Sequence, residues 1–255
     1  MLPSPTILAD APDSVAISTL GTGPFVRLRV RFQKSKPIRW LSHHDLIRAM
    51  DRLLRRLALP VVHSQGFHPN PAMVFALSLP LGALGHEEVV EIDLQGLDWN
   101  VSDLLVQLNL HAPPGLTFLG IQRVGTKDRA RVESMDYRTL VPPSLLEKTK
   151  KLLPEILAKE ALWVHRQDPT ASPMVFSDPN SRYSKDLKRS LKNLTLADFQ
   201  LEITLVPQPE GTLKPIEILA MLDWPLSSKD FSTPQWERSR LIIAGENSQE
   251  RFRSS

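Results

Sequence analysis

The chain has 255 residues, of which 42% are hydrophobic and 23% charged, the composition of an ordinary globular protein. It has no cysteine, which excludes disulfides, thiol nucleophiles and iron–sulfur or zinc sites built on cysteine. The formal net charge is only +3, yet residues 27–56 hold ten Lys/Arg against two acidic residues, a local charge of +8. Because a polyanion responds to local charge, this segment is the first candidate for a binding surface.

The first 24 residues lack the basic start and compact apolar stretch of a signal peptide, and we expect them to form a disordered tail. No apolar run approaches the roughly 20 residues that a membrane-spanning helix needs. The default expectation is therefore a cytoplasmic protein without a membrane partner.

Residues 26–33 alternate between apolar and polar side chains, which is the period-two pattern of a half-buried strand. The apolar set faces one side of this strand and the arginines face the other. We expect the exposed side to present Arg27, Arg29 and Arg31.

A helix is predicted after Lys36-Pro37. Ser42 is a suitable N-cap, Asp45 stands three residues later as in a capping box, and Pro60 ends the helix. One face of this helix is apolar. The opposite face is basic and consists of His44, Arg48, Arg52 and Arg55 or Arg56.

The pattern continues with strands at 73–81 and 89–94, a helix at 101–110 and a strand at 117–124. The order strand, helix, strand, strand, helix, strand is the ferredoxin-like pattern. A similar order follows, with strands at 136–141, 162–166, 199–206 and 240–243 and helices at 143–158 and 215–222. Pro154 should kink or shorten the first of these helices.

The predicted fold class is therefore α+β, with two tandem ferredoxin-like domains that contain antiparallel sheets. The domains span 25–126 and 132–244, between an N-terminal tail (1–24) and a C-terminal tail (245–255). Residues 168–193 form a long polar segment with five Lys/Arg, which we expect to be a functional or solvated loop.

Three motifs stand at fixed spacing in the first half: LSHHD at 41–45, SQGFHPNP at 64–71, and FAL followed by Gly82 at 75–82. On these residues the chain resembles the radical SAM-linked proteins, a bacterial family of uncharacterised function. In this chain His68 precedes and Asn70 follows Pro69, whereas that family usually has the reverse order.

Members of that family are fused to, or encoded beside, a radical SAM enzyme that carries a cobalamin-binding domain, and they often neighbour ribonuclease genes. The resemblance implies an accessory role in RNA modification, such as tRNA or rRNA modification, or in RNA processing. Because this chain has no cysteine, the radical chemistry would belong to the partner, and we expect no cofactor here.

The basic segment and the SQGFHPNP motif suit phosphate contacts and base stacking, as in recognition of single-stranded or structured RNA. The alternative is a solvated helix face whose arginines pair with Asp45 and Asp51. The predicted RNA-binding residues are Arg27, Arg29, Arg31, Arg39, Arg48, Arg52, Arg55, Gln65, Phe67, His68 and Asn70.

Catalysis is a further possibility, with His43, Asp45 and His68 as candidate acid–base groups. The structural alternative is that Ser42 and Asp45 cap a helix and that His43 packs below the loop. A metal site that uses these groups with His44 and His63 is less favoured, because adjacent histidines on a helix cannot face one ion.

Three hypotheses follow for the function. The first is a non-catalytic adaptor that presents RNA to a radical SAM enzyme. The second is an enzyme that acts on RNA with His43 or His68. The third is an adaptor that binds the partner protein without RNA.

Overall fold

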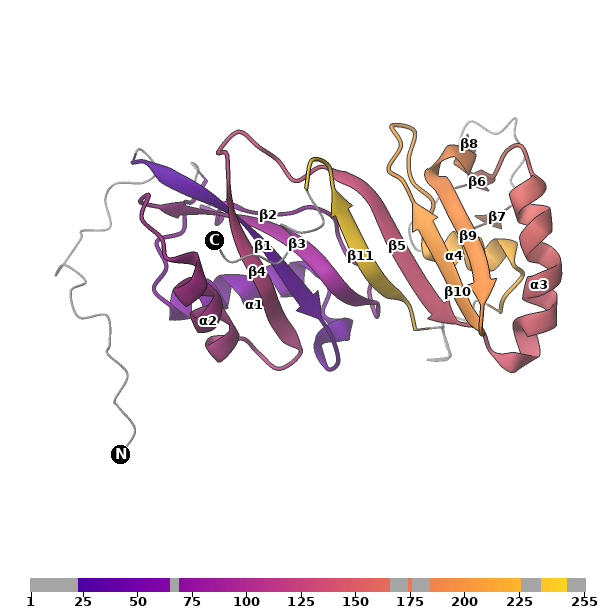
Figure 1. The fold of residues 1–255 in the computed structure, drawn as a ribbon, viewed down its shortest axis with the longest axis horizontal. Helices are drawn as coiled ribbons and strands as arrows, with labels where there is room; N and C mark the ends of the chain where they lie inside the picture. Colours follow the sequence, from indigo (N-terminus) through magenta and orange to yellow (C-terminus); the bar gives the residue numbers. More distant parts are fainter. Residues whose placement is uncertain (1–22, 65–68, 166–173, 176–183, 226–234, 247–255) are drawn as a thin grey trace.

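The structure is a computed structural model that describes residues 23–64, 69–165, 174–175, 184–225 and 235–246. The predicted terminal tails therefore lie almost entirely outside the described residues. The first half follows the predicted order of strands and helices (Figure 1). Its elements are β1 (Phe25–Lys34), the 3-10 helix η1 (Ile38–Trp40), α1 (His43–Arg56), β2 (Met73–Phe75), β3 (Leu84–Gln95), α2 (Val101–His111) and β4 (Leu116–Val124).

The second half also begins with a strand and a helix, and Pro154 does not shorten that helix. Its elements are β5 (Val132–Leu140), α3 (Pro143–Ala158), β6 (Trp163–His165), β7 (Met174–Val175), β8 (Ser184–Asp186), the 3-10 helix η2 (Lys188–Ser190), β9 (Leu191–Ala197), β10 (Gln200–Leu205), α4 (Pro215–Met221) and β11 (Glu237–Ile243).

The predicted polar loop at 168–193 is wrong in its described part, which contains β7, β8, η2 and the start of β9. Because the segment is mostly polar, its composition does not predict the burial of Leu187, which packs in the core of the second half. Asp186 also holds this segment in place, since its carboxylate accepts the backbone N–H groups of Leu162 and Lys188 at 2.8 and 3.0 Å.

Strands of both halves lie in one eight-stranded sheet in the order β4-β1-β3-β11-β5-β10-β9, with β2 paired to β3 (Figure 1). A separate three-stranded sheet has the order β7-β6-β8. The junction is β11, which pairs antiparallel with β5 and, over two residues, parallel with β3. This mixed, mainly antiparallel fold is consistent with the predicted α+β class, but two tandem ferredoxin-like domains are not confirmed.

Each half has its own hydrophobic core. In the first half, α1 and α2 pack their apolar faces on β1, β3 and β4. The predicted apolar face of α1 is buried, as Leu46, Met50 and Leu53 show. The second core brings α3 and α4 together with β5, β9, β10 and β11. No helix in the described ranges is long and apolar enough to cross a membrane.

Candidate functional site

Helix α1 begins as the sequence predicts. The Ser42 hydroxyl accepts the backbone N–H of Asp45 at 3.2 Å and donates to the Asp45 carboxylate at 2.7 Å. The hydrogen bond from Ser42 lowers the pKa of Asp45, and a negative charge in the first turn favours the helix dipole. Ser42 and Asp45 therefore act as a helix cap, which is the structural role considered for them.

The basic face of α1 is exposed and consists of His44, Arg48, Arg52, Arg55 and Arg56. Two of its arginines pair with the acids of the same helix: Arg48 lies 3.5 Å from Asp45, and Arg55 lies 3.0 Å from Asp51. Both pairs are solvated, since 72% and 67% of the arginine side chains are accessible. Such pairs are weak, so these cations stay available to a polyanion.

The two other arginines of this face have no acidic partner in the described part of the chain. Arg56 donates to the backbone carbonyl of His111 at the end of α2, at 3.2 Å, and Arg52 has no ion pair there. The basic face of α1 therefore has more cations than local acids can neutralise.

The predicted exposure of the β1 arginines is wrong. Arg27, Arg29 and Arg31 are only 3%, 7% and 3% exposed. Arg27 forms two hydrogen bonds with Asp93, at 2.7 and 2.8 Å, and donates to two backbone carbonyls in the loop after β4. The Asp93 carboxylate raises the pKa of the Arg27 guanidinium.

The other two strand arginines share one carboxylate. Arg29 pairs with Glu91 at 2.8 Å and with Glu246 at 3.2 Å, and Arg31 pairs with Glu246 and donates to the carbonyl of Leu241. The alternation of β1 correctly separates an apolar face from a charged one. It does not reveal that β3 places acids directly opposite, with Arg27 in register with Asp93 and Arg29 with Glu91.

The two described ends of the SQGFHPNP motif are closed on each other by hydrogen bonds between Ser64 and Asn70. The backbone N–H of Ser64 donates to the Asn70 carbonyl at 2.8 Å, and the Asn70 N–H donates to the Ser64 hydroxyl at 3.0 Å. His63 pairs with Pro71 below this closure. The predicted site residues Gln65, Phe67 and His68 lie outside the described residues.

His43 is half-buried rather than part of an exposed cluster. Its ring packs edge-on against Phe75, with centroids 5.1 Å apart. Burial lowers the pKa of His43, and the nearby His44 and Lys34 add to this effect. The edge-on packing against Phe75 matches the structural alternative considered for His43.

Arg39 and Trp40 lie just before α1 in η1. The Arg39 guanidinium stacks over the Trp40 ring at 4.5 Å and donates to Gln235 at 2.7 Å. Trp40 is half-exposed and packs against Gly82, where a Cβ atom would lie 2.7 Å from the ring. The Gly82 of the third motif therefore makes room for a residue just before the first motif.

Sequence reasoning missed a buried charged cluster at the junction of the halves. Arg238 is fully buried and forms a two-pronged ion pair with Glu88. It also donates to the hydroxyl of Tyr137 at 3.1 Å and to the carbonyls of Leu77 and Ser78. Burial alone would lower the pKa of Arg238, but the charge of Glu88 raises it above its usual value.

Lys34 lies at the edge of this cluster, and its amino group donates to the carbonyl of Leu41 at 2.7 Å. Burial lowers the pKa of Lys34. Lys34 thus binds the first motif at Leu41, and Arg238 binds the third motif at Leu77, so both motifs contribute to the structure of the junction. The sequence offers little signal for this cluster, since residues 237–243 hold two arginines, Arg238 and Arg240, and only the first is fully buried.

In the second half, two of the basic residues expected on a loop, Lys185 and Lys188, take structural roles. Lys188 donates to the carbonyls of Ile156 and Leu157 at the end of α3, and Lys185 donates to the carbonyl of Glu210. Across the described ranges, no three His, Asp or Glu residues lie close enough to hold a metal ion.

Comparison with known proteins gives one family. No curated protein matches the chain. The model of DUF2344, described as an uncharacterized protein conserved in bacteria, matches residues 27–215. This match spans the basic segment, all three motifs and most of the second half. The chain therefore belongs to the DUF2344 family of uncharacterized proteins conserved in bacteria.

Proposed function

We propose that the protein is an RNA-binding accessory protein and that the basic face of α1 contacts the phosphates. The observation that supports this most directly is the excess of exposed arginines on one helix, of which Arg52 and Arg56 have no acidic partner in the described chain. Cations in such a row gain affinity for any nucleic acid through release of its counterions.

Single-stranded or structured RNA is the favoured ligand because stacking groups are present as well as charge. Trp40 is 49% exposed, and Arg39 stacks on its ring. The predicted contacts of Gln65, Phe67, His68 and Asn70 remain part of the proposal. The strand arginines Arg27, Arg29 and Arg31 do not, since each is buried and ion-paired.

We further propose that the partner is a radical SAM enzyme with a cobalamin-binding domain and that this chain presents RNA to it. The resemblance of the three motifs supports this role. The competing hypothesis, an enzyme that acts on RNA, would require His43→Ala and His68→Ala to abolish RNA turnover while RNA binding persists. The third hypothesis, a protein adaptor alone, requires that RNA does not bind.

The test is the binding of a fluorescein-labelled 20-nucleotide single-stranded RNA at several salt concentrations. The triple variant Arg48→Gln, Arg52→Gln and Arg56→Gln should bind at least tenfold more weakly. Its salt slope should also fall by about 2, because each lost phosphate contact removes about 0.7 from the slope for a single strand.

The matched control replaces three exposed cations of the second half, Lys151→Gln, Arg189→Gln and Lys192→Gln, which changes the net charge equally. It should bind RNA like the unmodified protein. Equal losses in both triple variants would mean that net charge alone drives binding. Affinity that does not change with salt would refute phosphate contacts.

We also propose that the two halves are ferredoxin-like units fused edge to edge. The matching strand orders support this, β4-β1-β3-β2 in the first half and β11-β5-β10-β9 in the second, with antiparallel pairing in both. An experimental structure that showed a different strand order in either half would refute it.

A further inference from the structure

Strand β9 forms one edge of the eight-stranded sheet, and no strand of the described chain pairs with its outer side. It is joined to β10 by the turn Asp198–Phe199, in which both residues have positive φ, 46° and 64°, as in a type I′ turn. Ala197 and Gln200 are opposite each other and form the hydrogen-bonded pair next to the turn. Because the bonding alternates, the backbone groups of Leu194 and Leu196 point away from β10.

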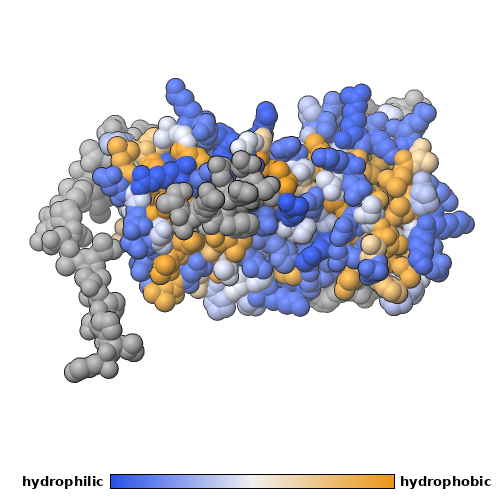
Figure 2. Space-filling model, in the orientation of Figure 1, coloured by the Kyte–Doolittle hydropathy of each residue, from blue (hydrophilic) through white to orange (hydrophobic). Residues whose placement is uncertain are grey.

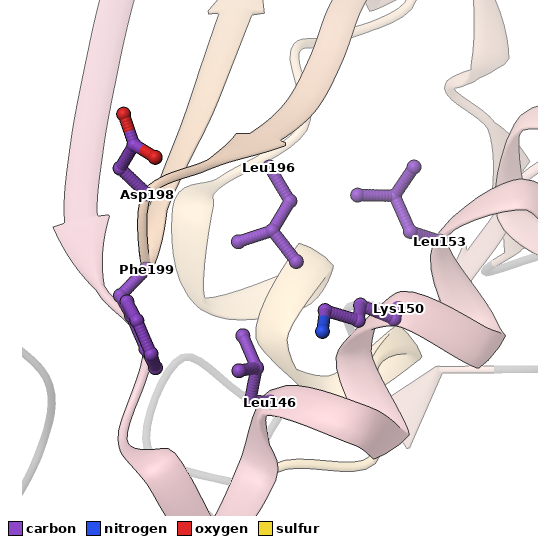
Figure 3. A pocket seen from close by; sticks show the side chains of 6 residues that line it. All are labelled: Leu146, Lys150, Leu153, Leu196, Asp198 and Phe199. Atoms are coloured by element: carbon purple, nitrogen blue, oxygen red, sulfur yellow. The ribbon is translucent and has the colours of Figure 1, made fainter.

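Helix α3 lies beside this edge and leaves a pocket of about 450 Å³ between itself and the β9–β10 hairpin (Figure 3). The pocket is lined by Leu146, Lys150 and Leu153 of α3 and by Leu196, Asp198 and Phe199 of the hairpin. In Figure 3 the apolar side chains face one another across the pocket. Hydrophobic residues also gather over β9 and the adjoining side of α3 in Figure 2.

Phe199 has a backbone conformation that is unusual for its side chain, with φ at 64°. A bulky residue at positive φ is a rare and strained choice, and glycine would suit this turn better. The side chain is nevertheless half-exposed at the rim of the pocket, and Leu140, opposite Gln200, is 70% exposed beside it. Strain of this kind is typical of residues that are held for binding.

Lys150 sets the charge of the pocket. Its side chain extends into the space between the apolar groups, whereas the carboxylate of Asp198 points away from that space (Figure 3). Within the described residues, the ammonium group has one acidic neighbour, the solvated Glu147 at 2.8 Å on the same helix. A ligand with a carboxylate would therefore complement the pocket, because a second acid could reach the same cation.

We propose that an extended segment of a partner protein binds between β9 and α3 as an added edge strand. Its backbone pairs with Leu194 and Leu196, its apolar side chains enter the pocket, and an Asp or Glu side chain faces Lys150. Strand addition accounts for both the open edge and the groove beside it. This surface lies at the end of the molecule distant from α1 (Figure 1), so it is independent of the proposed RNA contact.

A library of random eight-residue peptides displayed on phage, selected against the full chain, tests the proposal. Enriched peptides should alternate apolar residues, contain Asp or Glu at one position and exclude proline from the alternate positions that pair with β9. Selection against Lys150→Glu should replace the acidic residue with Lys or Arg. Failure to enrich any common pattern, or an unchanged charge preference with Lys150→Glu, would overturn the proposal.

The sharpest variant is Phe199→Gly, since it removes the rim while it relieves the strained turn. A selected peptide, measured by fluorescence anisotropy, should bind this variant at least tenfold more weakly. The thermal midpoint of the variant should be unchanged or higher. The matched control Ala58→Gly relieves another positive φ, 51° at the end of α1 and far from the pocket, and should bind normally. Equal affinity for the unmodified chain and Phe199→Gly would show that the peptide binds elsewhere.

Discussion

The arginines of β1 and those of α1 are neighbours in sequence, yet they have opposite roles. On β1, Arg27 is paired with Asp93 and almost inaccessible. On α1, Arg48 is 72% accessible and only loosely paired with Asp45. A guanidinium that is removed from water needs a carboxylate in contact, whereas an exposed one is stabilised by solvent. The arginines of β1 therefore stabilise the fold, whereas those of α1 can bind a ligand.

This contrast shows that positive charge counted along the sequence overstates the binding surface. Arg29 and Arg31 are neutralised by Glu91 and Glu246 and contribute little to the field outside the protein. The cations of α1 remain exposed to solvent. The positive electrostatic potential at the surface therefore comes from the helix α1 rather than from the strand β1.

The largest expected effect is on stability. Arg27→Met should lower the free energy of unfolding by about 3–5 kcal/mol, because it leaves Asp93 buried without its partner. Urea denaturation measures this loss. The comparison variant Arg52→Met on α1 should stay within about 0.5 kcal/mol of the unmodified protein, as surface substitutions do. Similar losses of stability in both variants would contradict the different roles of the β1 and α1 arginines.

A double variant tests whether the ion pair itself causes the loss of stability. Arg27→Met combined with Asp93→Leu removes both buried charges, so it should regain about 2 kcal/mol or more of the stability that Arg27→Met loses. The full recovery is not expected, since Arg27 also donates to the carbonyls of Thr126 and Asp128. If the two substitutions were simply additive, the ion pair would not be the source of the loss.

On α1, the cap should matter more for stability than any arginine. Ser42→Ala removes the hydroxyl that accepts the Asp45 N–H, and it should cost about 1 kcal/mol in urea denaturation. Ser42→Asp keeps an acceptor at the N-cap and serves as the control, with a smaller loss. A cost for Arg48→Ala as large as that for Ser42→Ala would contradict this order.

The smallest effect concerns pH. Burial lowers the folded-state pKa of His43 below its unfolded value of about 6.5, so the unfolded chain takes up the proton first. Stability from this group is complete above about pH 6.5 and is lost as pH falls toward the lower folded pKa. His43→Leu should flatten that part of the stability profile. NMR titration of His43 that gave a pKa above 6.5 would reverse the sign.

The local elements of the first half could be predicted from the sequence. It placed α1 between Ser42 and Pro60 and identified its buried and basic faces, because capping and helical periodicity depend on residues within a few positions. It also predicted the order of elements in the first half. The strand β9 was missed, because the polar segment before it obscured its start.

Which charges stay exposed to solvent depends on contacts between remote parts of the chain. The acidic residues that pair with the buried β1 arginines are distant in sequence. Asp93 is 66 residues from Arg27, and Glu246 is 215 residues from Arg31. Arg238 meets Glu88 only because β11 inserts between β3 and β5. Alternation along a strand determines which face of the sheet a side chain lies on. The residues that pair with it on that face come from remote segments, which local periodicity does not encode.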